Sequence, residues 1–200
     1  MRLCQRFDTT SLHRAGKKII LVNCSGSPIA LEPETKNCEA ILQAWYPGQA
    51  GGTAVADVLF GDYNPGGRLP VTFYRNMSQL PDFEDYNMTG RTYRYMTQQP
   101  LFPFGYGLSY TTFEYGNLSL AKEQIKVGEP LKLTVNVTNN GQRDGEEVVQ
   151  VYLKKQDDAE GPGKTLRAFK RVRIPAGKSV EVAFDLNGKE LEWWDAQSNT

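Results

Sequence analysis

The stretch Leu131-Lys-Leu-Thr-Val-Asn-Val137 decides the class of the C-terminal part of the chain, because apolar and polar residues alternate along its whole length. A period of two places every second side chain on the same face of a β-strand. The same alternation recurs at residues 149–153 and 180–186, and turns rich in glycine, asparagine and proline separate the three runs. Short alternating strands at this spacing predict an all-β sandwich.

The N-terminal part has a different pattern, in which the apolar runs are short and continuous. Lys18-Ile-Ile-Leu-Val-Asn23 and Ala40-Ile-Leu-Gln-Ala-Trp-Tyr46 each lead into turn residues, as buried strands do. The polar residues 32–37 between them are predicted to form a loop. A third strand is expected at Arg68-Leu-Pro-Val-Thr-Phe73, after the Pro-Gly-Gly turn.

A helix is expected between the second and third of these strands. Thr53 is a suitable N-cap, apolar residues line one face of the following segment, and Gly61 can adopt the left-handed conformation that ends a helix. Strand, strand, helix and strand in this order predict part of a layered α/β domain.

The change of pattern along the chain predicts its organisation. We expect an unassigned N-terminal segment at residues 1–16 and part of an α/β sandwich domain at residues 17–74. An aromatic-rich connector is expected at residues 75–115 and a fibronectin type III-like (immunoglobulin-like) sandwich at residues 116–200. The fold class is therefore a partial α/β domain followed by an all-β sandwich.

Composition excludes several kinds of partner. Lys+Arg and Asp+Glu both number 23, so no net charge favours a nucleic acid. No segment approaches the roughly 20 apolar residues of a membrane span, and the first residues lack the apolar core of a signal peptide. We therefore expect neither a nucleic-acid nor a membrane partner.

Cysteine and histidine are too few for a recognisable metal site. Cys4, Cys24 and Cys38 show no metal-ligand spacing, and His13 is the single histidine. The sequence leaves two alternatives open, a Cys24–Cys38 disulfide or two free thiols. No metal is expected. With a single histidine, the chain offers little basis for a histidine-based catalytic triad.

Several long motifs resemble glycoside hydrolase family 3, in its C-terminal domain and fibronectin-like module. They occur in the family's order from about Lys17 onward, and the last of them leads from the domain into the module. The motifs are Trp45-Tyr-Pro-Gly-Gln-Ala-Gly-Gly52, Ala54-Val-Ala-Asp-Val-Leu-Phe-Gly61, Asn64-Pro-Gly-Gly-Arg-Leu-Pro70, Arg91-Thr-Tyr-Arg-Tyr95 and Phe102-Pro-Phe-Gly-Tyr-Gly-Leu-Ser-Tyr-Thr111.

The resemblance implies a retaining β-glucosidase or β-xylosidase that releases terminal, non-reducing sugars through a covalent intermediate, without a cofactor. Its substrates would be oligosaccharides or aryl glycosides, and the whole enzyme would be periplasmic or secreted. Such hydrolysis needs two carboxyl groups about 5–5.5 Å apart. In the resembled enzymes the nucleophile is an Asp of an N-terminal barrel domain, which we expect to be missing here.

The acid/base of the resembled enzymes is typically a Glu upstream of the strand at residues 18–23. Asp8 is the only carboxylate there, and residues 1–15 show no resemblance to the family. We therefore carry over no catalytic residue, assign no substrate-binding residue and expect the chain alone to be inactive. We also expect the sandwich to lack its last strand, which in the family follows the segment resembling residues 191–195.

Several acids, two arginines and a serine offer local alternatives. Asp82, Glu84 and Asp85 could supply a catalytic pair, but three acids in one loop are more typical of a solvated segment. We expect Arg91 and Arg94 to pair with these acids rather than bind sugar. Two further acids, Asp57 and Asp62, are expected to be capping or surface groups, and Ser25 to be a turn hydroxyl.

Aromatic side chains leave a second interpretation open. Trp45, Tyr93, Tyr95 and Tyr106 could stack on sugar rings, although we expect them to pack within the protein. Trp193-Trp194 is expected to anchor the end of the sandwich. The alternatives to a glycosidase fragment are a non-catalytic carbohydrate-binding module and a structural remnant that needs its missing domains.

Overall fold

The computed structural model describes residues 8–158 and 161–193 and divides into two compact units. The first, called the N-terminal unit, comprises Met1–Asp62 with Pro70–Phe104, and the second, called the sandwich unit, comprises Tyr63–Leu69 with Gly105–Thr200. The expected domain boundaries after residues 16, 74 and 115 stay a prediction. No helix in the described part of the chain is long and apolar enough to cross a membrane.

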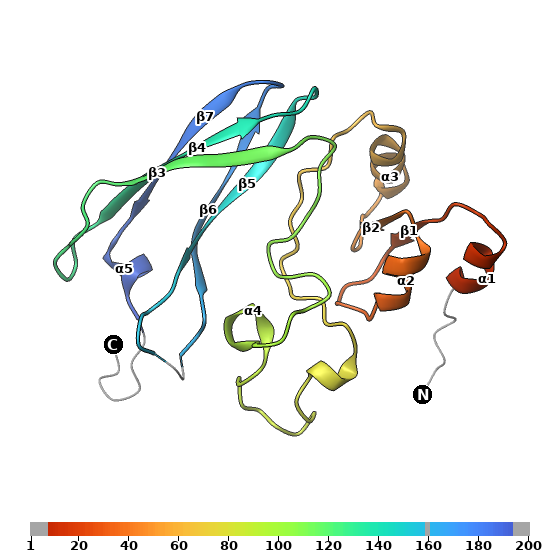
Figure 1. Ribbon diagram of the computed structural model, residues 1–200, viewed down its shortest axis with the longest axis horizontal. Helices are drawn as coiled ribbons and strands as arrows, with labels where there is room; N and C mark the ends of the chain where they lie inside the picture. Colours follow the sequence, from red (N-terminus) through yellow and green to blue (C-terminus); the bar gives the residue numbers. More distant parts are fainter. Residues whose placement is uncertain (1–7, 159–160, 194–200) are drawn as a thin grey trace. The chain divides into compact units, whose positions relative to one another are not determined.

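The N-terminal unit contains a two-stranded parallel sheet, with β1 paired to β2 from Ile20↔Ala40 to Asn23↔Gln43. The expected strands at residues 18–23 and 40–46 are thereby confirmed for residues 20–23 and 40–43. Helices α1, α2 and α3 are drawn near this sheet (Figure 1), and α2 contacts β2. The elements of the unit are α1 (Thr9–Arg14), β1 (Ile20–Asn23), α2 (Glu32–Asn37), β2 (Ala40–Gln43), α3 (Gly51–Phe60), η1 (Met77–Gln79) and α4 (Thr92–Tyr95).

The loop expected at residues 32–37 is wrong, because these residues form helix α2. Its first turn contains a proline and two acids, Glu32 and Glu34, which suit the start of a helix. The strand expected at residues 68–73 is also wrong. Only Phe73 forms a β-bridge there, with Phe102.

Helix α3 confirms the expected helix but begins earlier than expected. Ala50 is its N-cap rather than Thr53, and the helix ends at Gly61, which adopts a φ of 85° as expected. The early start depends on Gly51, which is buried. A Cβ atom on Gly51 would lie 2.6 Å from Cγ of Pro47, so the proline ring occupies the place of a side chain.

The sandwich unit consists of two antiparallel sheets, of order β3-β4-β7 and β5-β6. The alternating runs at residues 131–137, 149–153 and 180–186 lie in β4, β5 and β7, as expected. Alternation did not reveal β3, whose residues are almost all exposed, or β6, whose pairing contains a register shift. The elements are β3 (Phe113–Leu120), β4 (Leu131–Asn139), β5 (Gly145–Leu153), β6 (Thr165–Ile174), β7 (Ser179–Leu186) and α5 (Gly188–Leu191).

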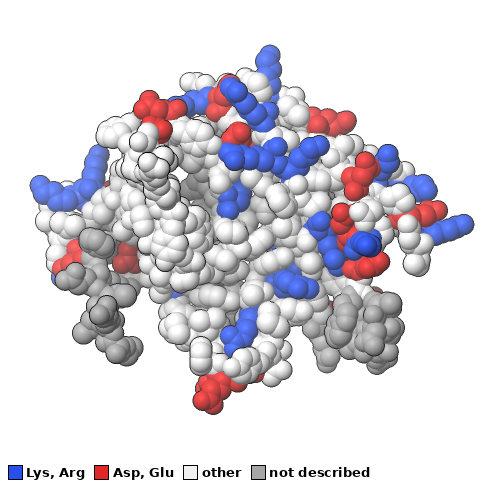
Figure 2. Space-filling view, turned by 180° about the vertical axis from the view of Figure 1, so that it is seen from behind, with Lys and Arg blue, Asp and Glu red and all other residues white. Residues whose placement is uncertain are grey.

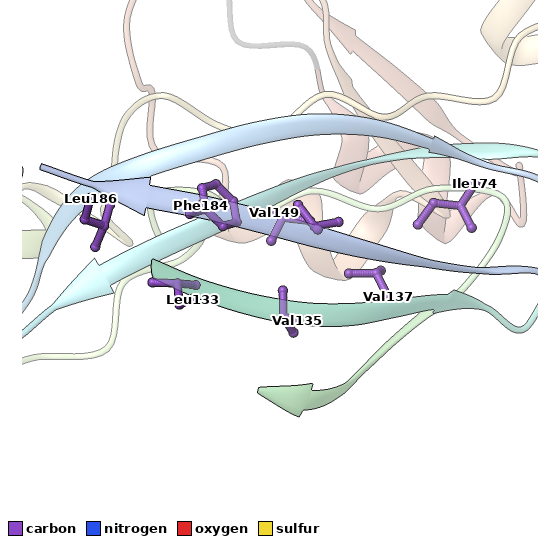
Figure 3. Close-up of a cluster of buried hydrophobic side chains, with 8 residues drawn as sticks. Leu133, Val135, Val137, Val149, Ile174, Phe184 and Leu186 are labelled. Carbon is purple, nitrogen blue, oxygen red and sulfur yellow. The ribbon is translucent and has the colours of Figure 1, made fainter. Parts of the chain in front are cut away.

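The core of the sandwich lies between the two sheets (Figure 3). Every second residue of β4 and β7 points into it, and β5 and β6 each supply one fully buried residue from the facing sheet. The buried cluster comprises Leu133, Val135, Val137, Val149, Ile174, Val182, Phe184 and Leu186. Burial of such side chains stabilises a domain by about 1.5–3 kcal/mol each.

Shortening Leu186 tests this core. Its side chain is 1% exposed, so Leu186→Ala should lower the free energy of unfolding by about 2–5 kcal/mol. Glu181→Ala on the solvent face of the same strand is the control and should change it by less than about 0.5 kcal/mol. Urea unfolding followed by circular dichroism measures both, and equal losses would contradict the assigned core.

Candidate functional site

The carboxyl ends of β1 and β2 lie at the same edge of their sheet, because the two strands are parallel. Ligands of α/β proteins commonly bind outside this edge. Asn23 and Gln43 are register partners at the ends of the strands, and Nδ2 of Asn23 donates to Oε1 of Gln43 at 2.5 Å. The turns that follow these two residues are therefore where a ligand is expected to bind.

The turn after β1 is fixed by hydrogen bonds to Ser25. Asn23 Nδ2 donates to the Ser25 hydroxyl at 2.9 Å, and Gln43 Nε2 donates to the Ser25 carbonyl at 3.2 Å. The hydroxyl itself donates to the carbonyl of Ser27 at 2.9 Å. Ser25 is thus a turn hydroxyl that holds the backbone at Gly26 in place.

The turn after β2 is an elbow formed by Trp45 and Tyr46. Trp45 has a φ of 56°, which is unusual for a bulky residue and costs of order 1–3 kcal/mol. Its ring lies edge-on to Phe73 at 6.3 Å, and Phe73 packs in the same way on Phe102. Trp45 is therefore a packing residue, whereas Tyr46 is 78% exposed. Sequence reasoning did not single out Tyr46, although it directly precedes a Pro-Gly turn.

The acids at residues 82–85 are exposed and hold their own loop together. Asp82 accepts from the backbone of Glu84, and Asp85 accepts from the backbone and side chain of Asn87. Arg91 donates to the backbone carbonyls of Asp82, Asp85 and Asn87. The expected pairing of Arg91 with these acids therefore runs through backbone carbonyls instead of carboxylates.

Residues 92–95 pack within the N-terminal unit. Tyr93 stacks on Phe104 with a centroid distance of 4.2 Å, and the Arg94 guanidinium lies 5.5 Å from the centre of the Tyr95 ring. The expected pairing of Arg94 with the acids is not among the described ion pairs, and its buried Nε lacks a hydrogen-bond partner. Tyr93 and Tyr95 therefore serve packing, as expected.

The remaining acidic and thiol candidates do not form a site. Asp8 caps α1 by accepting from the Ser11 backbone, and hydrogen bonds from Ser11 lower the pKa of its carboxyl. Asp57 lies on α3, and Asp62 is exposed beyond its end. In the described ranges no His, Cys, Asp or Glu cluster could hold a metal ion.

Cys24 and Cys38 are free thiols, which settles the alternative left open by the sequence. Burial raises the pKa of the Cys38 thiol, and the negative charges of Glu34 and Glu39 raise it further. Cys4 and Trp194 lie outside the described residues.

The sandwich unit contains a buried ion pair between Arg68 and Glu147. Their side chains are 11% and 8% exposed, and Tyr115 donates its hydroxyl to the other oxygen of Glu147 at 2.8 Å. Burial raises the pKa of the Tyr115 phenol, and the hydrogen bond to Glu147 raises it further. The Arg68 motif therefore serves architecture.

Asn64 joins the same motif to residues 109–110 and 144. Its Oδ1 accepts from the Ser109 hydroxyl and the Tyr110 backbone, and its Nδ2 donates to the Asp144 carbonyl, each at 2.8 Å. The backbone of Leu69 also donates to the carbonyl of Tyr106 at 2.8 Å. Residues 64–69 and 105–111 of the two family-like motifs thus meet within the sandwich unit.

The end of the described chain is anchored by one tryptophan. Trp193 Nε1 donates to Asp158 at 3.2 Å, and the Arg167 guanidinium lies 5.2 Å from the centre of its ring. This contact agrees with the expected anchoring role.

Over the face drawn in Figure 2, basic side chains lie beside acidic ones, in keeping with the balanced charge of the chain.

Comparison with known families identifies both parts. The glycosyl hydrolase family 3 C-terminal domain matches residues 8–110, and the fibronectin type III-like domain matches residues 147–200. The chain belongs to glycosyl hydrolase family 3. The match begins at residue 8, so the expectation that residues 8–15 are unrelated to family 3 is wrong.

Family 3 relatives resemble nearly the whole chain. A xylan 1,4-beta-xylosidase of Xylanibacter ruminicola is 57% identical over 98% of it, and a periplasmic beta-glucosidase of Salmonella typhimurium is 39% identical over 96%. A beta-glucosidase structure from Listeria innocua, in complex with isofagomine, covers 94% with a TM-score of 0.80 and 30% identity. The chain spans 22%, 27% and 28% of these proteins, respectively.

Removing the charge of Glu147 tests the buried ion pair of this family 3 chain. Glu147→Gln leaves Arg68 buried without a counter-charge and should lower the free energy of unfolding by about 3–5 kcal/mol. The neighbouring Glu146 pairs with the half-exposed Arg171, so Glu146→Gln is a matched control that should cost about 0–1 kcal/mol. Urea unfolding measures both. Similar losses for the two variants would contradict the importance of burial.

Tyr115 should make the chain sensitive to alkali. Its folded pKa lies above the ordinary value of 10, so the unfolded phenol loses its proton first as the pH rises. The contribution of the Tyr115 phenol to the free energy of unfolding is fully present below about pH 10 and decreases as the pH rises further. Urea unfolding at pH 9 and 11 should show a steeper loss for the wild type than for Tyr115→Phe. Equal slopes would contradict the raised pKa.

Proposed function

We propose that this chain forms the C-terminal part of a retaining β-glycosidase that hydrolyses terminal, non-reducing β-linked sugars. The observation that carries the proposal is 57% identity over 98% of the chain to a xylan 1,4-beta-xylosidase. Both family 3 domains also occur here in sequence order, at residues 8–110 and 147–200. The chain would contribute structure and substrate contacts, while other parts of the polypeptide complete the active site.

The contacts of the carboxylates in this chain support a catalytic pair located elsewhere in the enzyme. Retaining hydrolysis needs a nucleophile and an acid/base about 5–5.5 Å apart. The carboxylates of Asp8, Asp82 and Asp85 accept hydrogen bonds from their own turns, and that of Glu147 is tied to Arg68. A carboxylate committed to such contacts is poorly placed to act with a second carboxylate across a glycosidic bond. We therefore place the catalytic pair in the remainder of the enzyme, including an N-terminal barrel domain.

A β-xyloside is the proposed substrate in preference to a β-glucoside. Identity is 57% to the xylan 1,4-beta-xylosidase and 39% to the periplasmic beta-glucosidase. The Gly90-Arg-Thr-Tyr-Arg-Tyr95 segment, which resembles β-xylosidases, points the same way. The name of the Salmonella relative supports a periplasmic or secreted location for the whole enzyme.

Complementation tests the proposed function. The 200-residue chain alone should not release nitrophenol from p-nitrophenyl β-xyloside. The chain is then co-expressed with a truncated Xylanibacter relative from which the residues that match this chain have been removed. Together the two portions should restore hydrolysis and prefer the β-xyloside to the β-glucoside. The N-terminal portion expressed alone is the control.

Two results would overturn the proposal. One is hydrolysis by the chain alone that is abolished by Asp82→Asn or Asp85→Asn, because the catalytic acids would then lie here. The other is a soluble complex of the two portions that hydrolyses neither glycoside.

A further inference from the structure

We propose that the exposed ring of Tyr46 is a stacking platform for one pyranose ring of a β-linked oligosaccharide. This inference rests on the proposed glycosidase function and assigns a substrate contact to a residue that the sequence did not single out. It depends on how the two turns after β1 and β2 present the tyrosine.

The first part of the argument is the direction of the elbow. β2 ends at Gln43, and Trp45 then adopts a φ of 56°. Its indole packs edge-on against Phe73, which is 1% exposed. Because Trp45 is anchored in this way, the neighbouring Tyr46 stays at the surface, where it is 78% exposed. An unfavourable backbone conformation persists only where the surroundings impose it.

The second part is the contact between the Tyr46 ring and the backbone at Gly26. A Cβ atom on Gly26 would lie 2.5 Å from Cε2 of Tyr46 and 3.0 Å from its hydroxyl oxygen. The tyrosine therefore rests against the backbone at Gly26, in space that any other residue would fill. Ser25, fixed by Asn23 and Gln43, holds this backbone in position. The ring is supported along one side and open elsewhere.

The third part is the support of the following residue. Pro47 lies against Gly51, the first residue of α3, where a Cβ atom would be 2.6 Å from the proline ring. Tyr46 and Pro47 thus each rest on a glycine, one from the turn after β1 and one from the start of α3. Such a platform is already ordered before a ligand binds, which reduces the entropy lost on binding.

The chemistry of the platform fits a sugar. An aromatic face suits the C–H face of a pyranose ring, and no described residue forms a hydrogen bond with the Tyr46 hydroxyl, which is therefore available to a sugar hydroxyl. Ser27 and Gln49 are exposed in the same two turns and carry further hydrogen-bonding groups. The platform lies at the carboxyl edge of parallel strands, where α/β proteins commonly bind ligands.

Titration of the 200-residue chain with xylobiose, followed by NMR of the tyrosine ring signals, tests the platform directly. We expect shifts at Tyr46, and Tyr46→Ala should raise the Kd about tenfold. Tyr46→Trp keeps an aromatic face and should retain binding. Gly26→Ala, whose Cβ would displace the ring, should weaken it. Tyr86→Ala is the matched control, because Tyr86 is 91% exposed in the same unit.

Two titration results would overturn the inference. One is the absence of shifts at Tyr46 at millimolar xylobiose, and the other is an equal loss of affinity in Tyr86→Ala. Circular dichroism of each variant establishes that a loss of binding is not a loss of folding.

Kinetic measurements on the complemented enzyme distinguish a failure of this inference from a failure of the proposed function. Tyr46→Ala should raise KM for xylobiose with little change in kcat, because stacking on an unreactive ring binds substrate and transition state alike. Active enzyme with an unchanged KM would overturn the platform and leave the function standing. If Tyr46→Ala instead prevents the two portions from associating, Tyr46 is a contact between protein parts and the platform is overturned.

Discussion

The buried ion pair of Arg68 and Glu147 is the constraint on which the division of this chain depends. Two charges that are about nine-tenths buried cannot be separated without leaving one of them uncompensated, which costs several kcal/mol. Arg68 belongs to a short segment, Tyr63–Leu69, that lies in sequence between two parts of the N-terminal unit. The ion pair therefore assigns this segment to the sandwich, whatever its position in the sequence.

Asn64 shows why the segment needs side chains of particular types. Its amide has an acceptor and a donor, and the structure uses both, toward residues 109–110 on one side and the Asp144 carbonyl on the other. Aspartate could accept but not donate at neutral pH, and leucine could do neither. The same logic applies to Gly107, where a Cβ atom would lie 2.3 Å from the carbonyl oxygen of Gly67. These motifs of the family are thus explained by packing without reference to catalysis.

In the sandwich unit, sequence patterns predicted the strands in which burial alternates and missed those in which it does not. β4 and β7 bury every second residue, so their apolar period is visible in the sequence. β3 is an exposed edge strand, and helix α2 lacks an apolar face, so neither offers a period to detect. The signal for α2 was instead Pro33 and the flanking acids, which describe a helix start. Element type was thus predictable where a core imposed it.

The candidate site was predicted less well than the fold because side-chain direction depends on the backbone. Trp45 and Tyr46 are adjacent aromatic residues, and the sequence gives no reason to prefer the second as the exposed one. The preference arises from the left-handed backbone at Trp45 and from Gly26, which is 20 residues away in the chain. Long-range contacts of this kind leave no local pattern.

The acidic groups with a shifted pKa differ from a catalytic general acid in the direction of that shift. A general acid that works near neutral pH needs a raised pKa, usually through burial or a neighbouring negative charge. Among the described carboxyls with a shifted pKa, hydrogen bonds lower it in Asp8, Glu39, Glu129 and Asp144. These groups accept hydrogen bonds from backbone amides, which stabilise the ionised form and fix the chain locally. The carboxyls of Asp8, Glu39, Glu129 and Asp144 therefore differ from a general acid in the direction of their pKa shift, and their hydrogen bonds stabilise local backbone structure.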